Sequence, residues 1–311
     1  MEYDYDAVIL GGGPAGLSAG IYMARSNAKT AIIDTSMFGG QPSNYLELEN
    51  YPGFSIIGGY DLMEKFEEHA DKFGVDKFPM QEIKSVDLIS NPKIIETLDG
   101  IFRAKVVIIA CGAHPAKLGI KGEEEFLGRG VSYCAVCDGA FYQDKTVAVV
   151  GGGNTAVEEG IYLTKFAKKV YIIHRRNELR ADKIIQERAF SNEKIEFVLD
   201  TTVKEIQGDE TVNNLILENV KTKATESLNA DGIFPFIGFT PNIKEINGQV
   251  VQDEQGFIIT DETMKTSVDG VYAVGDVRKT PLRQVITAAS DGAIGAVYAG
   301  KYLELLCKVK V

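Results

Sequence analysis

The sequence has no long hydrophobic run, only four cysteines and no excess of positive charge. No stretch approaches 18 apolar residues, so no membrane-spanning helix is expected. The formal net charge of −11 argues against nucleic acid or an anionic membrane as the main partner. The acidic start, Met1-Glu2-Tyr3-Asp4, is unlike a secretory signal. With few cysteines and no signal, we expect a cytoplasmic protein rather than a disulfide scaffold.

The length of 311 residues suits about two domains, since a domain often has roughly 150 residues. The first domain opens with an apolar run, Ala7–Leu10, that predicts a buried strand. Six residues, Gly11 to Gly16, follow it and lead into a helical pattern over Leu17–Asn27. A second apolar run, Ala31–Ile33, ends at Asp34. Strand, glycine-rich turn, helix and strand in this order indicate a dinucleotide-binding unit.

Each glycine of this motif has a physical role. Gly11 allows the tight turn, Gly13 lets the backbone approach a pyrophosphate, and Gly16 lets the helix pack closely on the strand. The helix N-terminus faces the phosphates, and Asp34 can accept hydrogen bonds from ribose hydroxyls. The alternative is a glycine turn in an unrelated α/β unit.

The same pattern returns later in the chain, and residues 147–174 align with residues 7–34 without a gap. Gly151-Gly152-Gly153-Asn154-Thr155-Ala156 matches the first turn, so the repeat predicts a second dinucleotide site. Where the first copy has Asp34, the second has basic residues: His174, Arg175, Arg176 and then Arg180. An acid suits a free ribose 2′-hydroxyl, whereas basic groups suit a 2′-phosphate. The second site is therefore predicted to bind NADPH, and a solvated basic patch is the alternative.

Between the two motifs lies the pair Cys134-Ala-Val-Cys137, followed by Asp138. Thiols at this spacing can form and reopen a disulfide, which is the usual machinery of thiol–disulfide exchange. Asp138 is placed to exchange a proton with one thiol, and the alternative is a turn residue before Gly139. Half of a zinc site is a weaker reading, because zinc needs four ligands and no second such pair occurs. We expect a two-electron relay from one cofactor through another to an outside disulfide.

Other segments predict the rest of the fold. We expect a helix over 62–73, strands at 85–88, 94–97 and 105–110, and a small antiparallel piece over 195–236. A buried strand over 270–277 ends in Gly-Asp and precedes a helix over 288–299, which Arg283 and Gln284 open. Asp276 can bind a ribitol hydroxyl or cap a helix. The loops at 39–41 and 50–53 are taken from their residues alone as turns.

The whole chain closely resembles the bacterial thioredoxin reductases of the low-molecular-weight class. The resemblance rests on motifs in a specific order: GGGPAG at 11–16, GGQ at 39–41, CAVCDG at 134–139, GGGNTA at 151–156, HRRNELR at 174–180, and GVYAVGD with RQ at 270–276 and 283–284. It implies an α/β fold of two Rossmann-like domains of three-layer ββα type, with the second inserted in the first. Residues 1–113 and 244–311 would bind FAD, and residues 114–243 would bind NADPH and carry the redox pair.

The resemblance also implies the residues that act. The residues expected at FAD are Gly11, Gly13, Pro14, Ala15, Gly16, Asp34, Gly39, Gly40, Gln41, Asn50, Val86, Ala110, Gly112, Asp276, Arg283, Gln284 and Val285. Those expected at NADPH are Gly153, Asn154, Thr155, His174, Arg175, Arg176, Arg180 and Gly238. Cys137 would face the flavin, Cys134 would attack thioredoxin, and Asp138 would be the acid and base. The family works as a homodimer with thioredoxin as its partner, and no metal is expected.

Two positions depart from the family pattern: Cys111 replaces a usual Thr, and Val285 replaces a common Ala. We expect Cys111 and Cys307 to be inert thiols. Three alternative functions use the same scaffold: a reductase for another disulfide carrier, a dithiol oxidase and a ferredoxin-fed reductase. The 2′-phosphate site at 174–180 argues against the last two.

Overall fold

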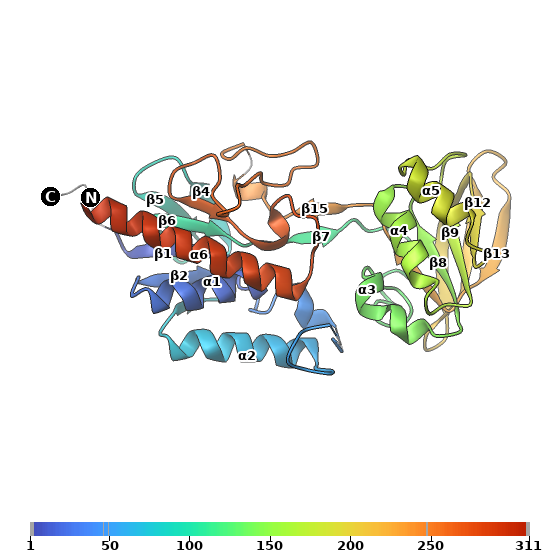
Figure 1. Cartoon of the computed structure of the whole chain (residues 1–311), viewed down its shortest axis with the longest axis horizontal. Coiled ribbons are helices and arrows are strands. Elements are labelled where there is room, and N and C mark those ends of the chain that lie inside the picture. The colour runs from blue at the N-terminus through green and yellow to red at the C-terminus, as the bar shows by residue number, and fades with distance from the viewer. Residues whose placement is uncertain (1–2, 46, 49, 247, 309–311) are drawn as a thin grey trace. The chain divides into compact units, whose positions relative to one another are not determined.

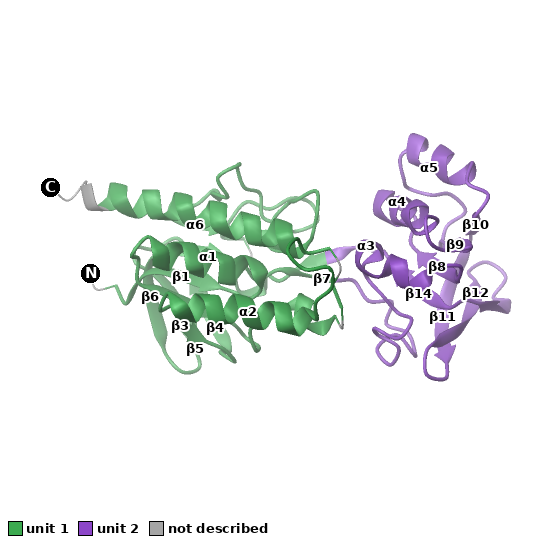
Figure 2. Cartoon of the chain, turned by 60° about the horizontal axis from the view of Figure 1, so that its bottom comes forward, with its two compact units in different colours: residues 1–114, 240–311 green, residues 115–239 purple. Residues whose placement is uncertain are grey.

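The computed structural model describes residues 3–45, 47–48, 50–246 and 248–308 (Figure 1). The chain forms two compact units, here called unit 1 (residues 1–114 and 240–311) and unit 2 (residues 115–239), coloured separately in Figure 2. The expected boundaries, 113 and 243, lie one and four residues away. The second boundary comes earlier because Asn242 and Ile243 belong with unit 1. The Asn242 amide donates to the Cys111 carbonyl at 2.9 Å, and Ile243 is buried in the unit 1 core.

Unit 1 has a mixed sheet with the order β3-β2-β1-β6-β5-β4, and β16 pairs with β6. Its strands are β1 (Tyr5–Leu10), β2 (Thr30–Ile33), β3 (Asp76–Phe78), β4 (Ile83–Asp87), β5 (Lys93–Thr97), β6 (Ile101–Ile109) and β16 (Val271–Ala273). Its helices are α1 (Pro14–Arg25), α2 (Gly59–Lys72) and α6 (Val285–Lys308), with short turns η1 (Gln41–Asn44), η3 (Lys244–Ile246) and η4 (Gly275–Val277). The strands β3, β2, β1, β6 and β16 are parallel, and β4-β5-β6 are antiparallel.

Both faces of the unit 1 sheet are buried, which is why its central strands are continuously hydrophobic. Alternate side chains of β1 point to opposite faces. Ala7 and Ile9 pack in a cluster with α1, α2 and α6, and Figure 1 shows α1 between the other two helices. Val8 and Leu10 pack on the other face, against side chains of β4 and β5 and the segment after Asn242.

Unit 2 has a parallel sheet with the order β10-β9-β8-β14 and an antiparallel sheet β11-β12-β13. Its elements are α3 (Ala135–Asp138), η2 (Gly139–Tyr142), β8 (Thr146–Val150), α4 (Asn154–Leu163), β9 (Lys169–Ile173), α5 (Lys183–Phe190), β10 (Ile195–Val198), β11 (Thr201–Gly208), β12 (Val212–Asn219), β13 (Thr225–Asn229) and β14 (Gly232–Pro235). The helices α4 and α5 cover one face of the parallel sheet, and the antiparallel sheet covers the other. These three layers confirm the predicted fold class.

The two chain crossings between the units pair with each other as β7 (Ala113–Pro115) and β15 (Phe239–Pro241). None of the helices in the described part of the chain has the length and hydrophobicity that a membrane crossing requires.

Some sequence predictions were wrong in detail. The antiparallel piece expected over 195–236 is confined to β11–β13, because β10 and β14 join the parallel sheet beside β9 and β8. The alternation of side chains gives a strand's faces but not its partners. The helix α1 begins at Pro14 rather than Leu17, since proline fits the first turn of a helix. The helix α6 is longer than predicted at both ends and begins after Arg283 and Gln284.

Candidate functional site

Cys134 and Cys137 are joined by a disulfide, with their Cα atoms 5.3 Å apart. Cys134 is the N-cap of the short helix α3, and its Sγ accepts a hydrogen bond from the Cys137 amide at 3.1 Å. A backbone amide aimed at sulfur stabilises a thiolate more than a neutral thiol. Both residues are half-buried, so the pair is partly accessible from outside. This arrangement favours Cys134 as the nucleophile once the disulfide is reduced.

Asp138 ends α3, and its amide donates to the Cys134 carbonyl at 3.1 Å. Burial raises the pKa of the Asp138 carboxyl, and a hydrogen bond with Ser132 partly offsets that rise. Ser132 also contacts Cys134: its hydroxyl accepts from the Cys134 amide at 3.1 Å. A carboxyl with a raised pKa keeps its proton closer to neutral pH and is suited to general acid catalysis. Sequence reasoning missed Ser132, which links the Asp138 carboxyl to the Cys134 backbone.

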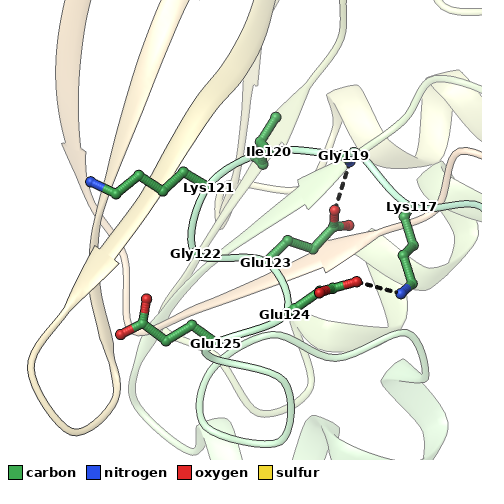
Figure 3. A pocket seen from close by; sticks show the side chains of 8 residues that line it. All are labelled: Lys117, Gly119, Ile120, Lys121, Gly122, Glu123, Glu124 and Glu125. Atoms are coloured by element: carbon green, nitrogen blue, oxygen red, sulfur yellow. Dashed lines mark hydrogen bonds and ion pairs between the residues drawn. The ribbon is translucent and has the colours of Figure 1, made fainter.

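The segment before the dithiol is fixed by a buried carboxylate. Glu123 is only 2% exposed, and it accepts the amides of Leu118 at 2.8 Å and Gly119 at 2.7 Å. It also accepts the hydroxyl of Tyr133, the residue before Cys134, at 2.8 Å. Figure 3 shows Glu123 turned back toward its own loop, whose residues 117 and 119–125 line a pocket of about 380 Å³. No predicted site residue is among these, and the loop contacts the segment before the dithiol through the hydrogen bond between Glu123 and Tyr133.

The first glycine-rich turn is held by hydrogen bonds from within unit 1. The Gly12 amide donates to Oδ2 of Asp34 at 2.6 Å, and Oδ1 of Asp34 accepts from the amide and hydroxyl of Ser36. Asp34 therefore braces the turn, and its carboxylate still has lone pairs for a ribose hydroxyl. A Cβ added to Gly13 would meet only the Gly40 Cα, at 3.8 Å, among the described residues. The described residues otherwise leave this space open, which fits a backbone approached by a pyrophosphate.

Two further predicted segments converge on this turn. The Gly39 amide donates to the Gly12 carbonyl at 2.9 Å, so the start of the 39–41 loop lies beside the motif. The Gly275 backbone lies so close to α1 that an added Cβ would be 2.8 Å from the Cβ of Ala15. The turn η4, which carries Asp276, therefore lies against the start of α1.

Asp276 has a buried oxygen that fits a cofactor hydroxyl. Its Oδ1 has no hydrogen-bond partner among the described residues. Burial raises the pKa of Asp276 to about 6, with Asp291 adding to the rise and Arg283 opposing it. A buried acceptor without a donor is costly, so this oxygen favours a hydroxyl donor from a ligand. Asp276 fits the ribityl chain of FAD better than it fits a simple helix cap.

The other residues predicted at FAD take several positions in unit 1. The Arg283 guanidinium stacks on the Phe257 ring at 4.2 Å, and the Asn50 amide donates to Gln284 at 3.0 Å. The Gln41 amide donates to the Ala113 carbonyl, beside Gly112. Val86 differs from these: its side chain is buried in the core under the sheet, and its carbonyl accepts from Gln249 at 2.7 Å.

The second glycine-rich turn is also held by hydrogen bonds, and three exposed arginines follow β9, the second strand of its unit. A Cβ on Gly153 would meet no described atom within 4 Å, which again leaves room for a phosphate. The Arg180 amide donates to the Gly152 carbonyl at 2.6 Å, which brings Arg180 to the turn. The Arg175 and Arg176 side chains are exposed. These three arginines are placed to carry positive charge beside the second turn.

His174 differs from its basic neighbours because it is only 5% exposed. Its ring packs on Gly152, where an added Cβ would lie 2.5 Å from ring atoms. Burial lowers the pKa of His174, and so do the charges of Arg180, Arg176 and Arg175. The imidazole is therefore neutral near pH 7 and shapes the turn, while the arginines supply the charge.

The remaining predicted residues lie near these features. The Asn154 amide donates to Asp182 at 2.8 Å, and Thr155 is exposed on the first turn of α4. Gly238, with φ of +133°, accepts the Ala116 amide at the chain crossing. Burial raises the pKa of Cys111 to about 12, and its thiol lies 3.4 Å from the Leu10 carbonyl, which suits an inert thiol. The side chain of Cys307 lies outside the described residues.

Comparison with known proteins agrees with this geometry. A model of the pyridine nucleotide-disulphide oxidoreductase family matches residues 5–292. A thioredoxin reductase from Bacillus subtilis is 46% identical, with 98% of this chain and 96% of the relative covered. One from Peptoclostridium acidaminophilum is 48% identical, with 98% of both chains covered.

Solved structures give the same result. The crystal structure of thioredoxin reductase from Streptococcus pyogenes is 47% identical and superposes with a TM-score of 0.90, covering 96% of this chain and 98% of the other. Thioredoxin reductase from Giardia duodenalis is 37% identical with a TM-score of 0.91, covering 97% of this chain and 100% of the other. Since both the family model and these relatives span nearly the whole chain, the protein belongs to the pyridine nucleotide-disulphide oxidoreductase family, among the thioredoxin reductases.

Proposed function

We propose that this protein is an NADPH-dependent disulfide reductase that passes electrons through FAD and the Cys134–Cys137 disulfide to oxidised thioredoxin. The observation that carries the proposal is the conjunction of a disulfide beside a buried acid with two braced glycine-rich turns. The thioredoxin reductases that match nearly the full chain support it. FAD, when bound, supplies a two-electron carrier between NADPH and the disulfide.

The cofactor residues are assigned by the same reasoning. The first turn, Asp34 and the loop at Gly39–Gln41 would bind FAD, with Asp276 accepting a ribityl hydroxyl. The remaining FAD residues are those named from the resemblance, although the buried position of Val86 restricts it to backbone contacts. Arg175, Arg176 and Arg180 would bind the 2′-phosphate of NADPH, with Gly153 beside the pyrophosphate. Exposed guanidinium groups suit a cofactor that must enter and leave in each cycle.

The chain's own groups account for the thiol chemistry. Two electrons and two protons convert the Cys134–Cys137 disulfide to a dithiol. The Cys134 thiolate then attacks the disulfide of thioredoxin, and one thioredoxin sulfur leaves as a thiolate. Asp138 would protonate the departing thiolate, a role that the rise in its pKa caused by burial favours. The Cys137 thiolate attacks the mixed disulfide, which restores the internal disulfide and releases reduced thioredoxin.

The surface next to the disulfide supports a protein substrate. Val136, between the two cysteines, is 37% exposed, and Phe141, shortly after them, is 44% exposed. Exposed apolar side chains beside a reactive pair are suited to contact a protein partner. A small thiol substrate would not need this surface.

The experiment that tests the function measures stoichiometry. Purified protein, NADPH and oxidised thioredoxin are mixed without oxygen, and NADPH loss is compared with the new thioredoxin thiols. We expect one NADPH consumed for each thioredoxin disulfide reduced, and very little NADPH consumed when thioredoxin is replaced by a glutaredoxin. Turnover only with another disulfide carrier, with reduced ferredoxin or with oxygen would move the function to the corresponding alternative.

We also propose that the protein is a cytoplasmic homodimer. Exposed apolar residues on α1 and α6, including Tyr22, Val297 and Leu305, support a protein contact through unit 1. A dithiol that must cycle through its reduced form suits a reducing compartment. Light scattering should give twice the mass of one chain, and a monomer at micromolar concentration would contradict the dimer. Cell fractionation tests the compartment.

A further inference from the structure

We propose that Asp291 and Arg278 form a clamp that positions Asp276 for FAD. Arg278 directly follows η4, the turn that carries Asp276, and Asp291 lies on α6. The Arg278 Nε donates to Oδ2 of Asp291 at 2.6 Å, and an Nη donates to Oδ1 at 3.0 Å. Arginine and aspartate thus form a bidentate pair, which fixes both distance and orientation.

The same carboxylate also holds the start of the turn. The Gly275 amide donates to Oδ2 of Asp291 at 3.1 Å. Asp291 therefore contacts the residue before Asp276, which is Gly275, and the residue two positions after it, which is Arg278. The three donors engage both oxygens of Asp291, whereas Oδ1 of Asp276 has no partner in the described part of the chain. Asp291 fixes the turn, and Asp276 presents an oxygen to a ligand.

The clamp is largely buried, so water competes little with its hydrogen bonds. The side chains of Arg278 and Asp291 are 15% and 10% exposed. Removing one partner of a buried pair leaves the other charge uncompensated, whereas an exposed pair contributes little. Asp291 also lies close enough to Asp276 to raise the pKa of that carboxyl. Arg278 limits the repulsion between the two acids by neutralising Asp291.

The clamp connects the turn to the first glycine-rich motif through α6. The helix approaches α1 so closely that a Cβ on Gly292, next to Asp291, would lie 3.0 Å from the Ala19 amide nitrogen. One turn earlier, the Ala289 carbonyl accepts the Ser18 hydroxyl at 2.7 Å. The turn with Asp276 and the helix after Gly13 are thereby held on one rigid support. Loss of the clamp should displace Asp276 without unfolding the hydrophobic core of unit 1.

The inference rests on the proposed role of Asp276 at FAD, so the experiment tests both roles separately. FAD release from the purified holoprotein is followed as the rise of flavin fluorescence after dilution, for Asp276→Asn, Asp291→Asn and the double variant. A matched control is Asp6→Asn, which breaks the pair of Asp6 with Lys105 at 2.6 Å on β1 and β6. Thermal unfolding midpoints are recorded for all variants. Visible circular dichroism reports the surroundings of the bound flavin.

We expect Asp276→Asn and Asp291→Asn each to speed FAD release about tenfold, since each removes a contact with a charged group. The double variant should release FAD little faster than either single variant, because Asp291 acts through Asp276. Asp6→Asn should lower the unfolding midpoint and leave the release rate unchanged. Arg278→Lys keeps the charge but loses the bidentate geometry, and should shift the flavin dichroism as Asp291→Asn does.

Other outcomes overturn one of the two roles. If the effects of Asp276→Asn and Asp291→Asn multiply in the double variant, the two residues act independently and the clamp is wrong. If Asp291→Asn changes only the unfolding midpoint, as the control does, the pair is merely structural. If Asp276→Asn leaves FAD release unchanged, the proposed cofactor role of Asp276 fails instead. Should Asp291→Asn not fold, Arg278→Lys alone and combined with Asp276→Asn gives the same comparison.

Discussion

The two glycine-rich units share a plan but differ where their second strands end. In the first, the Asp34 carboxylate accepts the Gly12 amide and ties the strand to the turn by a hydrogen bond. In the second, the neutral ring of His174 packs on Gly152 and fills the equivalent space. The same backbone motif is therefore stabilised once by a charge and once by packing.

The surroundings of the two turns differ as well. The first turn is contacted by the Gly39 loop, and the start of α1 lies against η4, the turn that carries Asp276. Segments of unit 1 that are distant in the sequence therefore surround the first turn. Beside the second turn, Asn154, Arg175 and Arg176 are exposed. An enclosed site suits a cofactor that stays bound, and an open one suits a cofactor that exchanges. This difference supports the proposal that the first unit binds FAD and the second binds NADPH.

The largest effect should come from removing the thiol that passes electrons from the two cofactor units to thioredoxin. Cys134→Ser should lower thioredoxin reduction by more than about a thousandfold, because no thiolate remains to attack the substrate. FAD should stay bound and remain reducible by NADPH. Steady-state turnover and flavin absorbance check the two halves of this prediction. Full turnover in the variant would contradict the assignment of the attacking thiol.

The next effect should come from removing the charge that distinguishes the second unit. Arg175→Ala with Arg176→Ala should lower the preference for NADPH over NADH about a hundredfold, since two charge-assisted contacts to the phosphate are lost. The ratio of kcat/KM for the two cofactors measures this preference. Arg188→Ala, on the exposed surface of α5, is the matched control and should leave the ratio unchanged. An unchanged ratio in the double variant would place the phosphate elsewhere.

A matched pair of glycine substitutions sharpens the comparison. Gly13→Ala and Gly153→Ala each add a methyl group where the fold leaves room, so unfolding midpoints should barely change. Because the methyl group meets the cofactor backbone instead, Gly13→Ala should weaken FAD retention and Gly153→Ala should raise the KM for NADPH, each about tenfold. Flavin content and steady-state kinetics separate the two results. Both variants losing FAD would mean that the second turn does not bind NADPH.

The smallest effect concerns stability and a position where the copies differ. Glu159, on α4, aligns with the fully buried Ala19 of α1, and burial raises the pKa of Glu159 to about 7. Its Oε2 has no partner among the described residues. The folded state holds this proton more tightly than the unfolded state, so stability falls as the pH rises from about 4.5 to above 7.

Glu159→Ala, which copies the first unit, should therefore stabilise unit 2 by roughly 1–2 kcal/mol at pH 8, a part of what the shift in pKa allows. The gain should shrink toward pH 5, where the carboxyl is already protonated in the folded state. Thermal unfolding at the two pH values measures the difference. Glu158→Ala, at the exposed neighbouring position, is the control. An equal gain at both pH values would assign the effect to helix propensity.

Much of the fold could be predicted because glycine spacing and apolar runs are local signals. The turns at Gly11 and Gly151, the dithiol and the arginine cluster all lie within short stretches. Contacts between distant residues left no such signal: Arg278 and Asp291 are 13 positions apart, and nothing in their spacing predicts a bidentate pair. Burial of His174 was equally hidden, because its neighbours Arg175 and Arg176 are exposed. Strand partners also escaped prediction, as β10 and β14 illustrate.

The central claim, that the first unit holds FAD and the second takes NADPH, is tested most directly by anaerobic mixing. The purified yellow protein is mixed separately with NADPH and with NADH while flavin absorbance is followed. The account predicts fast bleaching by NADPH and bleaching by NADH that is slower by at least about tenfold. Equal rates with both cofactors, or no bleaching by either, would contradict the assignment of the arginine cluster to the 2′-phosphate.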